Sequence, residues 1–193
     1  MTIKQQLLKS FYPVLMRLSS LKSGRIKKNT LNKRPLVSIY NLETMKINGE
    51  SLLLKDLKGK KMLLVNTASD CGYTNQYAEL EKLYSEHKNK LVVLAFPSND
   101  FKEQEKGTDA DIATFCKINY GVSFPLIKKS QVIKGDAQND VFNWLSNAAK
   151  NGWNNQAPVW NFSKYLVDEA GVLTHYFDPS LSPLSKDIVG AIL

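Results

Sequence analysis

Cys71 is the residue whose type and position most directly suggest chemistry. It stands in NTASDCGYT at residues 66–74, between the apolar run MLLV and the periodic stretch NQYAELEKLYSEH. We therefore expect it between a strand and a helix, with Gly72 allowing a tight turn. Helix N-termini favour a thiolate, and ligand sites in α/β sheets gather beyond the carboxyl ends of strands. The position suits a nucleophile, but a buried structural thiol remains an equal alternative.

The second cysteine, Cys116, lies in TDADIATFCKIN, where Thr108 and Asp111 predict a capping box at a helix start. Ile112, Phe115 and Cys116 would share an apolar face, so the residues alone indicate a small buried hydrophobe. Two cysteines are too few for a disulfide scaffold, and their separation matches no zinc spacing, so we expect neither metal nor cofactor. His87 and His175 are distant from Cys71 in sequence, although a Cys–His hydrolase remains open because such partners meet in space.

The positive charge is confined to one end of the chain. The net charge is +8, and residues 1–36 hold nine Lys or Arg residues and no acidic residue. The rest of the chain is therefore close to neutral, which argues against a nucleic-acid-binding domain. No apolar run approaches the length that a membrane-spanning helix needs.

Residues 1–36 are predicted to form a basic extension that is amphipathic or disordered. Helical spacing relates the apolar residues Leu7, Leu8, Phe11, Leu15 and Leu18, with Lys4, Lys9 and Arg17 among the polar positions and Pro13 placed to kink a helix. An uninterrupted secretory h-region is missing. Three interpretations stay open: a disordered extension, a membrane-surface anchor, or an organelle-targeting leader.

Residues 37–193 are predicted to form one α/β domain. Asn48-Gly49 indicates a β-hairpin between VSIYNLETMKI and ESLLLKDL. Strands are expected in KMLLVNT, KLVVLAF and FPLIKK, alternating with helices, the last of them in NDVFNWLSNAAK. A second hairpin joins FSKYLVD to GVLTHYF, and a final helix is expected to open at Ser182-Pro183. This order predicts a central mixed sheet flanked by helices.

Three ordered motifs resemble the glutathione peroxidase family in its cysteine form. They are NTASDCGYTNQYAELEKLY, LAFPSNDFKEQE at 94–105 and WNFSKYLVDEAGVL at 160–173, and the similarity extends over residues 37–193. The resemblance implies a thioredoxin-like fold and an antioxidant peroxidase that acts on hydrogen peroxide and on organic or lipid hydroperoxides. It also implies that Cys71 is the peroxidatic residue, in a tetrad with Gln104, Trp160 and Asn161. Side-chain amides and indole would donate hydrogen bonds as the O–O bond breaks and Cys71 becomes a sulfenic acid.

The same resemblance gives Cys116 a second interpretation. FCKINYGVSFP is similar to the segment that carries the resolving cysteine in thioredoxin-dependent members, which implies a Cys71–Cys116 disulfide that thioredoxin, or alternatively glutathione, reduces. Because a disulfide needs Cα atoms within roughly 7 Å, a helix holding Cys116 away from Cys71 would have to unwind in part.

The sequence also departs from the family pattern. Ser98 replaces a third cysteine, Asp100 replaces glutamine, and Lys106 replaces proline. Asp100 would raise the Cys71 pKa if it lay close. An oligomerisation insertion is missing, so we expect a monomer.

Two other functions use the same residues. A peroxide sensor would use the same two cysteines, whereas a generic thiol–disulfide oxidoreductase should have a second cysteine where Thr74 stands. Thiols that cycle through a disulfide suit a reducing compartment, so we expect the protein in the cytoplasm. Association with a membrane through residues 1–36 is a further expectation.

Overall fold

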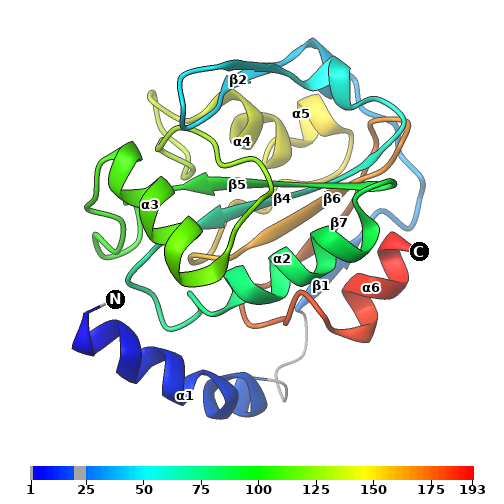
Figure 1. Ribbon diagram of the computed structural model, residues 1–193. Helices are drawn as coiled ribbons and strands as arrows, with labels where there is room; N and C mark the ends of the chain where they lie inside the picture. The colour runs from blue at the N-terminus through cyan, green and yellow to red at the C-terminus, as the bar shows by residue number, and fades with distance from the viewer. Residues whose placement is uncertain (1, 20–24) are drawn as a thin grey trace.

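The computed structural model describes residues 2–19 and 25–193, apart from the side chains of residues 8, 9, 13 and 15–19. The chain forms a five-stranded sheet with helices on both faces (Figure 1). In chain order the helices and strands are α1 (Ile3–Ser19), β1 (Ile26–Lys28), β2 (Glu43–Met45), β3 (Ser51–Leu53), β4 (Lys61–Thr67), α2 (Gln76–His87), β5 (Leu91–Pro97), α3 (Asp109–Tyr120), α4 (Asp140–Leu145), α5 (Ala148–Asn151), β6 (Lys164–Val167), β7 (Leu173–Phe177) and α6 (Lys186–Ile192).

The central sheet is mixed, as the sequence predicts. Its strand order is β1-β7-β6-β4-β5. Strands β4 and β5 are parallel, from the pair Lys61–Leu91 to the pair Thr67–Pro97, and the remaining pairs are antiparallel. Because β4 and β5 lie next to each other and run the same way, both end at one edge of the sheet. The residues that follow them, including Cys71 and Gln104, begin at this edge.

Alternation along the strands divides the core into two layers. In β4, Leu63 and Val65 pack with α2, α3 and α6 on one face, whereas Met62 and Leu64 pack with α4 and the β2–β3 hairpin on the other. Successive side chains of a strand point to opposite faces, so an unbroken apolar run fills both layers. Cys71 and Cys116 both belong to the layer under α2 and α3.

The predicted hairpin at Asn48-Gly49 is present as the two-stranded β2–β3 sheet, which is separate from the central sheet. Gly49 has a φ of 88°, a conformation that glycine adopts without strain. The capping box of α3 is also present: Thr108 accepts from the Asp111 backbone N–H, and Asp111 accepts in return from that of Thr108.

Three predicted elements differ from the structure. FPLIKK does not form a strand, because Leu126 and Ile127 make only isolated bridges, to Ala95 and Lys46. The helix predicted in NDVFNWLSNAAK is split into α4 and α5, since Asn147 leaves helical geometry and caps α5 instead. The last helix begins at Lys186 with Ser185 as its N-cap, so the predicted start at Ser182-Pro183 is wrong. Ser182 instead donates a hydrogen bond to Glu79.

The N-terminal extension contributes two elements. Helix α1 runs without a break from Ile3 to Ser19, as predicted for an amphipathic segment. The predicted apolar positions Leu8, Leu15 and Leu18, the basic Lys9 and Arg17, and Pro13 lie outside the described side chains. Strand β1 was not predicted, and it pairs with β7 at the edge of the sheet. Within the part of the chain that the structure describes, no helix is long and apolar enough to cross a bilayer.

Candidate active site

Cys71 lies in a tight turn between β4 and α2. The Thr74 hydroxyl accepts a hydrogen bond from the Cys71 N–H at 3.0 Å and lies 2.7 Å from the Cys71 carbonyl oxygen. The Tyr73 N–H donates to the Cys71 sulfur at 3.4 Å. Thr74 therefore closes the turn, and this explains why a short polar side chain occupies a position where a Cys-x-x-Cys motif would place cysteine.

The environment of Cys71 acts on its thiol in two directions. Burial raises the pKa, and the Asp70 charge raises it further, whereas hydrogen bonds from the Tyr73 N–H, Trp160 and Asn161 lower it. The net pKa lies above the ordinary value of a thiol because only 1% of Cys71 is exposed. Helix α2 begins at Gln76, so the backbone donor that reaches the sulfur is the Tyr73 N–H of the turn before the helix.

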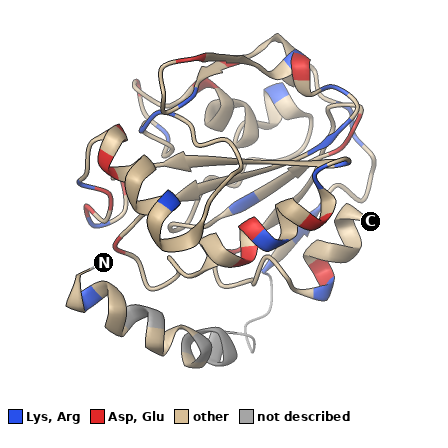
Figure 2. Cartoon of the chain, in the orientation of Figure 1, with Lys and Arg blue, Asp and Glu red and all other residues tan. Residues whose placement is uncertain are grey.

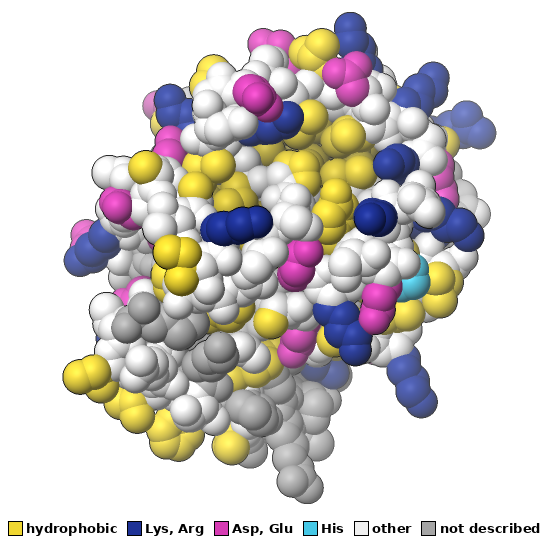
Figure 3. Space-filling view, in the orientation of Figure 1, with side chains coloured by type: hydrophobic (Ala, Val, Ile, Leu, Met, Phe, Trp, Pro, Cys, Tyr) yellow, Lys and Arg dark blue, Asp and Glu magenta, His cyan; other side chains and the backbone are white. Residues whose placement is uncertain are grey.

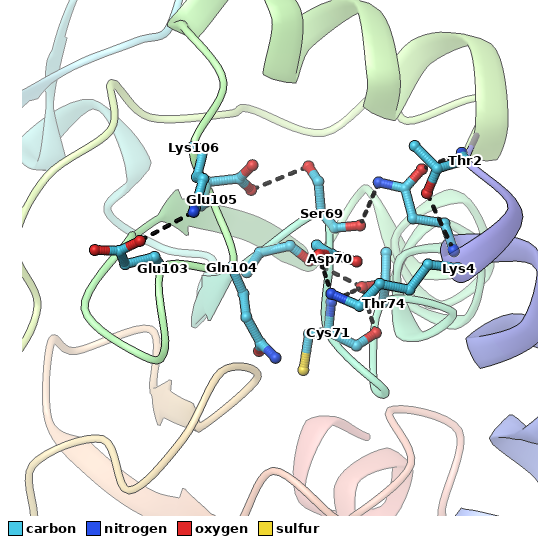
Figure 4. Close-up of polar contacts among 12 residues, drawn as sticks. Thr2, Lys4, Ser69, Asp70, Cys71, Thr74, Glu103, Gln104, Glu105 and Lys106 are labelled. Carbon is cyan, nitrogen blue, oxygen red and sulfur yellow. Dashed lines mark hydrogen bonds and ion pairs between the residues drawn. The ribbon is translucent and has the colours of Figure 1, made fainter.

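Gln104 is placed by the loop that follows β5. The preceding residues, Lys102 and Glu103, have φ values of 52° and 50°, which are uncommon for residues with side chains. The Asp70 N–H donates to the Gln104 carbonyl at 3.0 Å, joining this loop to the neighbour of Cys71. In Figure 4 the amide end of Gln104 and the sulfur of Cys71 extend into the same space below the turn.

Trp160 and Asn161 come from the loop that leads into β6. This loop is tied to the end of β4, because Asn66 donates its side-chain amide to the Trp160 carbonyl and accepts at its own carbonyl from the Phe162 N–H. Phe162 is fully buried with a φ of 70°, so its packing holds a strained backbone in place. Lys164 secures the same loop, donating to the carbonyls of Phe162 and Leu181 at 2.8 Å each.

The four predicted tetrad residues thus come from three loops at one edge of the sheet. The Asn161 side-chain amide donates to Gln104 Oε1 at 2.9 Å. This bond uses the oxygen of the Gln104 amide and not its N–H groups. The ring of Trp160 packs against Phe101, with centroids 5.6 Å apart, and Lys102 Nζ lies 5.7 Å from the ring centroid. Neutral N–H donors therefore surround a buried sulfur, an arrangement that stabilises negative charge developing there.

Cys116 faces the core from the middle of α3, and neither cysteine is in a disulfide. It is fully buried, and burial raises the pKa of its thiol to about 12. A hydrogen bond from Tyr77 acts in the opposite direction, and the charge of Glu105 adds to the increase. In this conformation Cys116 is the small buried hydrophobe that its helical face predicts, and it is not poised as a nucleophile.

Glu105 is a buried acidic residue that the sequence analysis did not identify. It is 2% exposed, its carboxylate accepts from the Ser69 hydroxyl at 3.1 Å, and burial raises its pKa to about 7. Its neighbour Gln104 was found through the motif, but no local pattern distinguishes a buried glutamate from a surface one. Lys164 was missed for the same reason, and burial lowers its pKa to about 7.

The three departures from the family pattern are not among the groups that act on the Cys71 thiol. The carboxylate of Asp100 accepts from the backbone N–H groups of Val132 and Ile133, so the acidic neighbour that acts on Cys71 is Asp70, not Asp100. Lys106 pairs with Glu103, and buried Ser98 accepts from the Asp100 N–H.

Neither histidine is among the groups that hydrogen-bond Cys71. His87 ends α2, and His175 in β7 stacks on Phe177. Within the described residues no three His, Cys, Asp or Glu side chains form a group able to hold a metal.

Comparison with known proteins decides the family. The glutathione peroxidase family model matches residues 39–146. The chain belongs to the glutathione peroxidase family. It is 48% identical over 147 residues to a glutathione peroxidase homolog, BsaA, of Staphylococcus epidermidis, covering 76% of this chain and 92% of the relative. It is 43% identical to the glutathione peroxidase-like peroxiredoxin 2 of Saccharomyces cerevisiae, covering 78% of this chain and 93% of the relative.

Solved structures agree with this assignment. The crystal structure of T. cruzi GPX1 has a TM-score of 0.61 and 29% identity, covering 80% of this chain and 94% of that chain. A thiol:disulfide interchange protein from Chlorobium tepidum, at 12% identity and a TM-score of 0.60, shares the fold alone, covering 83% of this chain and 97% of its own. The predicted family, the thioredoxin-like fold and the peroxidase class are therefore confirmed.

Proposed function

We propose that this peroxidase reduces hydrogen peroxide and organic or lipid hydroperoxides at Cys71. The Cys71 thiolate attacks the terminal peroxide oxygen, the O–O bond breaks, and the departing oxygen takes a proton to leave as water or alcohol. Cys71 is thereby oxidised to a sulfenic acid. The observation that carries the proposal is the Asn161–Gln104 hydrogen bond beside a buried sulfur that also receives hydrogen bonds from Trp160 and Asn161.

The second half of the proposed cycle uses Cys116. Its sulfur attacks the sulfenic sulfur, an S–S bond forms, and the hydroxyl group leaves as water after taking a proton. A dithiol reductant of the thioredoxin class then returns both cysteines to thiols, while glutathione is the alternative reductant. The names of two relatives, glutathione peroxidase-like peroxiredoxins of Saccharomyces cerevisiae and Chlamydomonas reinhardtii, favour a peroxiredoxin-like cycle.

The proposal includes the setting of the enzyme. We expect a cytoplasmic monomer, since thiols that cycle through a disulfide need a reducing compartment. Residues 1–36 are proposed to make peripheral contact with a membrane, because they are basic and include the helix α1 with its exposed apolar residues.

Coupled assays test the cycle directly. NADPH consumption with hydroperoxide is compared between a thioredoxin/thioredoxin reductase couple and a glutathione/glutathione reductase couple, for wild type, Cys71→Ser and Cys116→Ser. We expect turnover with thioredoxin that both substitutions abolish. Glutathione-driven turnover that survives Cys116→Ser would instead assign a one-cysteine mechanism. One oxidation without turnover in either couple would favour a peroxide sensor.

A further inference from the structure

One face of α1 lies against the turn at residues 69–74 that holds Cys71, called the catalytic turn below. Lys4 forms an ion pair with Asp70, and the Gln5 side-chain amide donates to the Ser69 carbonyl at 3.1 Å (Figure 4). About two turns further along α1, Tyr12 is 3% exposed and its hydroxyl donates to Glu79 in α2 at 2.9 Å. The helix is thus bound to the two residues that precede Cys71 and to the helix that follows it.

The opposite face of α1 is apolar and has no partner among the described residues. Ile3, Leu7, Phe11 and Val14 are 78%, 55%, 64% and 56% exposed. Their spacing of four, four and three residues places them along one side of a helix, and we call them the α1 stripe. Figure 3 shows apolar side chains along the outer edge of this helix, at the lower left.

The charge of the surrounding segment indicates what covers the α1 stripe. Helix α1 itself holds Lys4, Lys9 and Arg17 and no acidic residue, whereas acidic and basic side chains are interspersed over residues 37–193 (Figure 2). A helix with exposed apolar residues in a basic segment suits an anionic lipid surface. A second copy of this chain would bring two equally basic segments together, which like charges oppose.

The N-terminal extension also borders two hollows beside the turn that holds Cys71. A cavity of about 440 Å³ is lined by Thr2 and Gln5 of the extension together with Ser69, Gln104 and Glu105. Gln5 and Ser69 also line a smaller pocket with Cys71 and Tyr120. A surface that receives α1 would therefore lie beside these hollows and close to the turn that holds Cys71.

We infer that the α1 stripe seats the protein on an anionic lipid surface, and that Lys4 and Gln5 hold the catalytic turn to the seated helix so that the approach to Cys71 opens beside the lipid. The binding surface stands by itself, and its catalytic consequence rests on the proposed function. The substrate favoured by this arrangement is a hydroperoxide carried by a membrane lipid, whose polar group is drawn toward the interface.

Vesicle co-sedimentation tests the surface without any assay of catalysis. The full chain is mixed with phosphatidylcholine vesicles with and without phosphatidylglycerol. We expect binding to the anionic vesicles that Leu7→Gln/Phe11→Gln/Val14→Gln reduces about tenfold or more, because three apolar side chains no longer enter the interface. Met45→Gln/Ile118→Gln/Ile133→Gln, which alters exposed apolar residues outside residues 1–36, should bind as wild type does.

Two results would overturn the inferred surface. One is equal binding of the α1-stripe variant and the wild type. The other is wild type that ignores vesicles but dimerises in a stripe-dependent manner by sedimentation velocity, which would assign the stripe to a second copy. Thermal melting of each variant checks that the fold is intact, and Phe11→Gln alone serves as a milder variant.

The coupling to Cys71 is tested with Gln5→Ala, which keeps the α1 stripe and every charge of the helix. Vesicle binding should match wild type, whereas the ratio of kcat/KM for a phospholipid hydroperoxide in anionic vesicles to kcat/KM for hydrogen peroxide in solution should fall about fivefold or more. An unchanged ratio would disprove the coupling. If vesicle binding holds but no hydroperoxide is reduced, the proposed function fails and the surface stands. If soluble peroxide is reduced without vesicle binding, the reverse follows.

Discussion

At the scale of single residues, burial and hydrogen bonding act in opposite directions on the pKa of the Cys71 thiol. Burial and the Asp70 charge raise its pKa, and three donors lower it. Donors that are fixed in place stabilise negative charge at the sulfur without reorganising during a reaction. Around a fully exposed thiolate, water would have to reorganise instead. The Asn161–Gln104 hydrogen bond links two of the tetrad side chains, so they should act as a unit.

We predict that Asn161→Ala and Gln104→Ala each slow sulfenic acid formation by about 10²-fold or more, because each removes a positioned donor. The double variant should lose little beyond the stronger single variant, since residues that act together are not additive. Rapid-mixing kinetics with hydrogen peroxide measures all four rates. Losses that multiply would show that the two side chains act independently.

Glu105 gives a pH dependence at the same scale. Its pKa is about 7 in the fold against an ordinary value of 4.5, so the fold favours the protonated acid. Its contribution is present in full below pH 4.5 and is lost as pH rises from 4.5 to about 7. The loss amounts to about 3 kcal/mol of the free energy of unfolding. Glu105→Gln should remove this loss, because a neutral amide can still accept from Ser69.

Urea unfolding at pH 5 and pH 8 measures this effect. We expect the wild type to lose more stability than Glu105→Gln across that interval. Glu103→Gln is the matched control, since Glu103 is an exposed residue two positions away. Identical pH profiles for wild type and Glu105→Gln would mean that Glu105 is already ionised in the fold.

At the scale of elements, α3 must change for the proposed cycle to close. Cys116 lies in its third turn, fully buried, with a thiol pKa of about 12. A nucleophilic thiolate therefore does not form there at neutral pH while the helix stays folded over it. Opening of α3 would expose Cys116 to water, relieve the burial that raises its pKa and let it move toward Cys71.

We predict that hydrogen-exchange protection of residues 108–120 falls when the protein is oxidised by one equivalent of peroxide. The reason is that a Cys71–Cys116 bond requires Cα atoms within roughly 7 Å. Cys116→Ser treated in the same way is the control and should keep its protection. Unchanged protection in oxidised wild type would count against resolution by Cys116.

At the scale of the whole molecule, the segment that precedes residue 37 contributes strand β1 to the sheet. β1 pairs with β7, the Asp178 N–H donates to the Arg25 carbonyl, and the Leu36 N–H donates to the Lys150 carbonyl. A Cβ at Gly152 would collide with the Arg34 carbonyl, so the chain passes directly over that glycine. β1 also covers an edge of the sheet that would otherwise be open to pairing with another chain.

We predict that a chain beginning at residue 37 is about 1–3 kcal/mol less stable than one beginning at residue 25, because it also loses the edge hydrogen bonds of β1. Urea unfolding of both truncated chains and the full protein measures this difference, and light scattering reports edge-to-edge association. Equal stability of the two truncated chains would show that β1 contributes nothing to the domain.

The sequence by itself determined the family, the hairpin at Asn48-Gly49 and the capping box of α3. These features depend on residue types at short and fixed spacing, so local chemistry is enough to predict them. The alternating strands likewise predicted a mixed sheet between helices. Even the two interpretations of Cys116, as core residue and as resolving cysteine, follow from its helical face and its motif.

Only the tertiary structure decided the pKa values of the buried groups, the pairing of the strands and the position of α1. The raised pKa of Cys71 and of Glu105 depends on atoms brought from distant segments, and burial outweighs the donors in both. The same holds for the strand that FPLIKK does not form and for the edge strand β1, because pairing depends on which neighbours are available. The two faces of α1 were settled by its contacts with Ser69, Asp70 and Glu79, which no helical pattern contains.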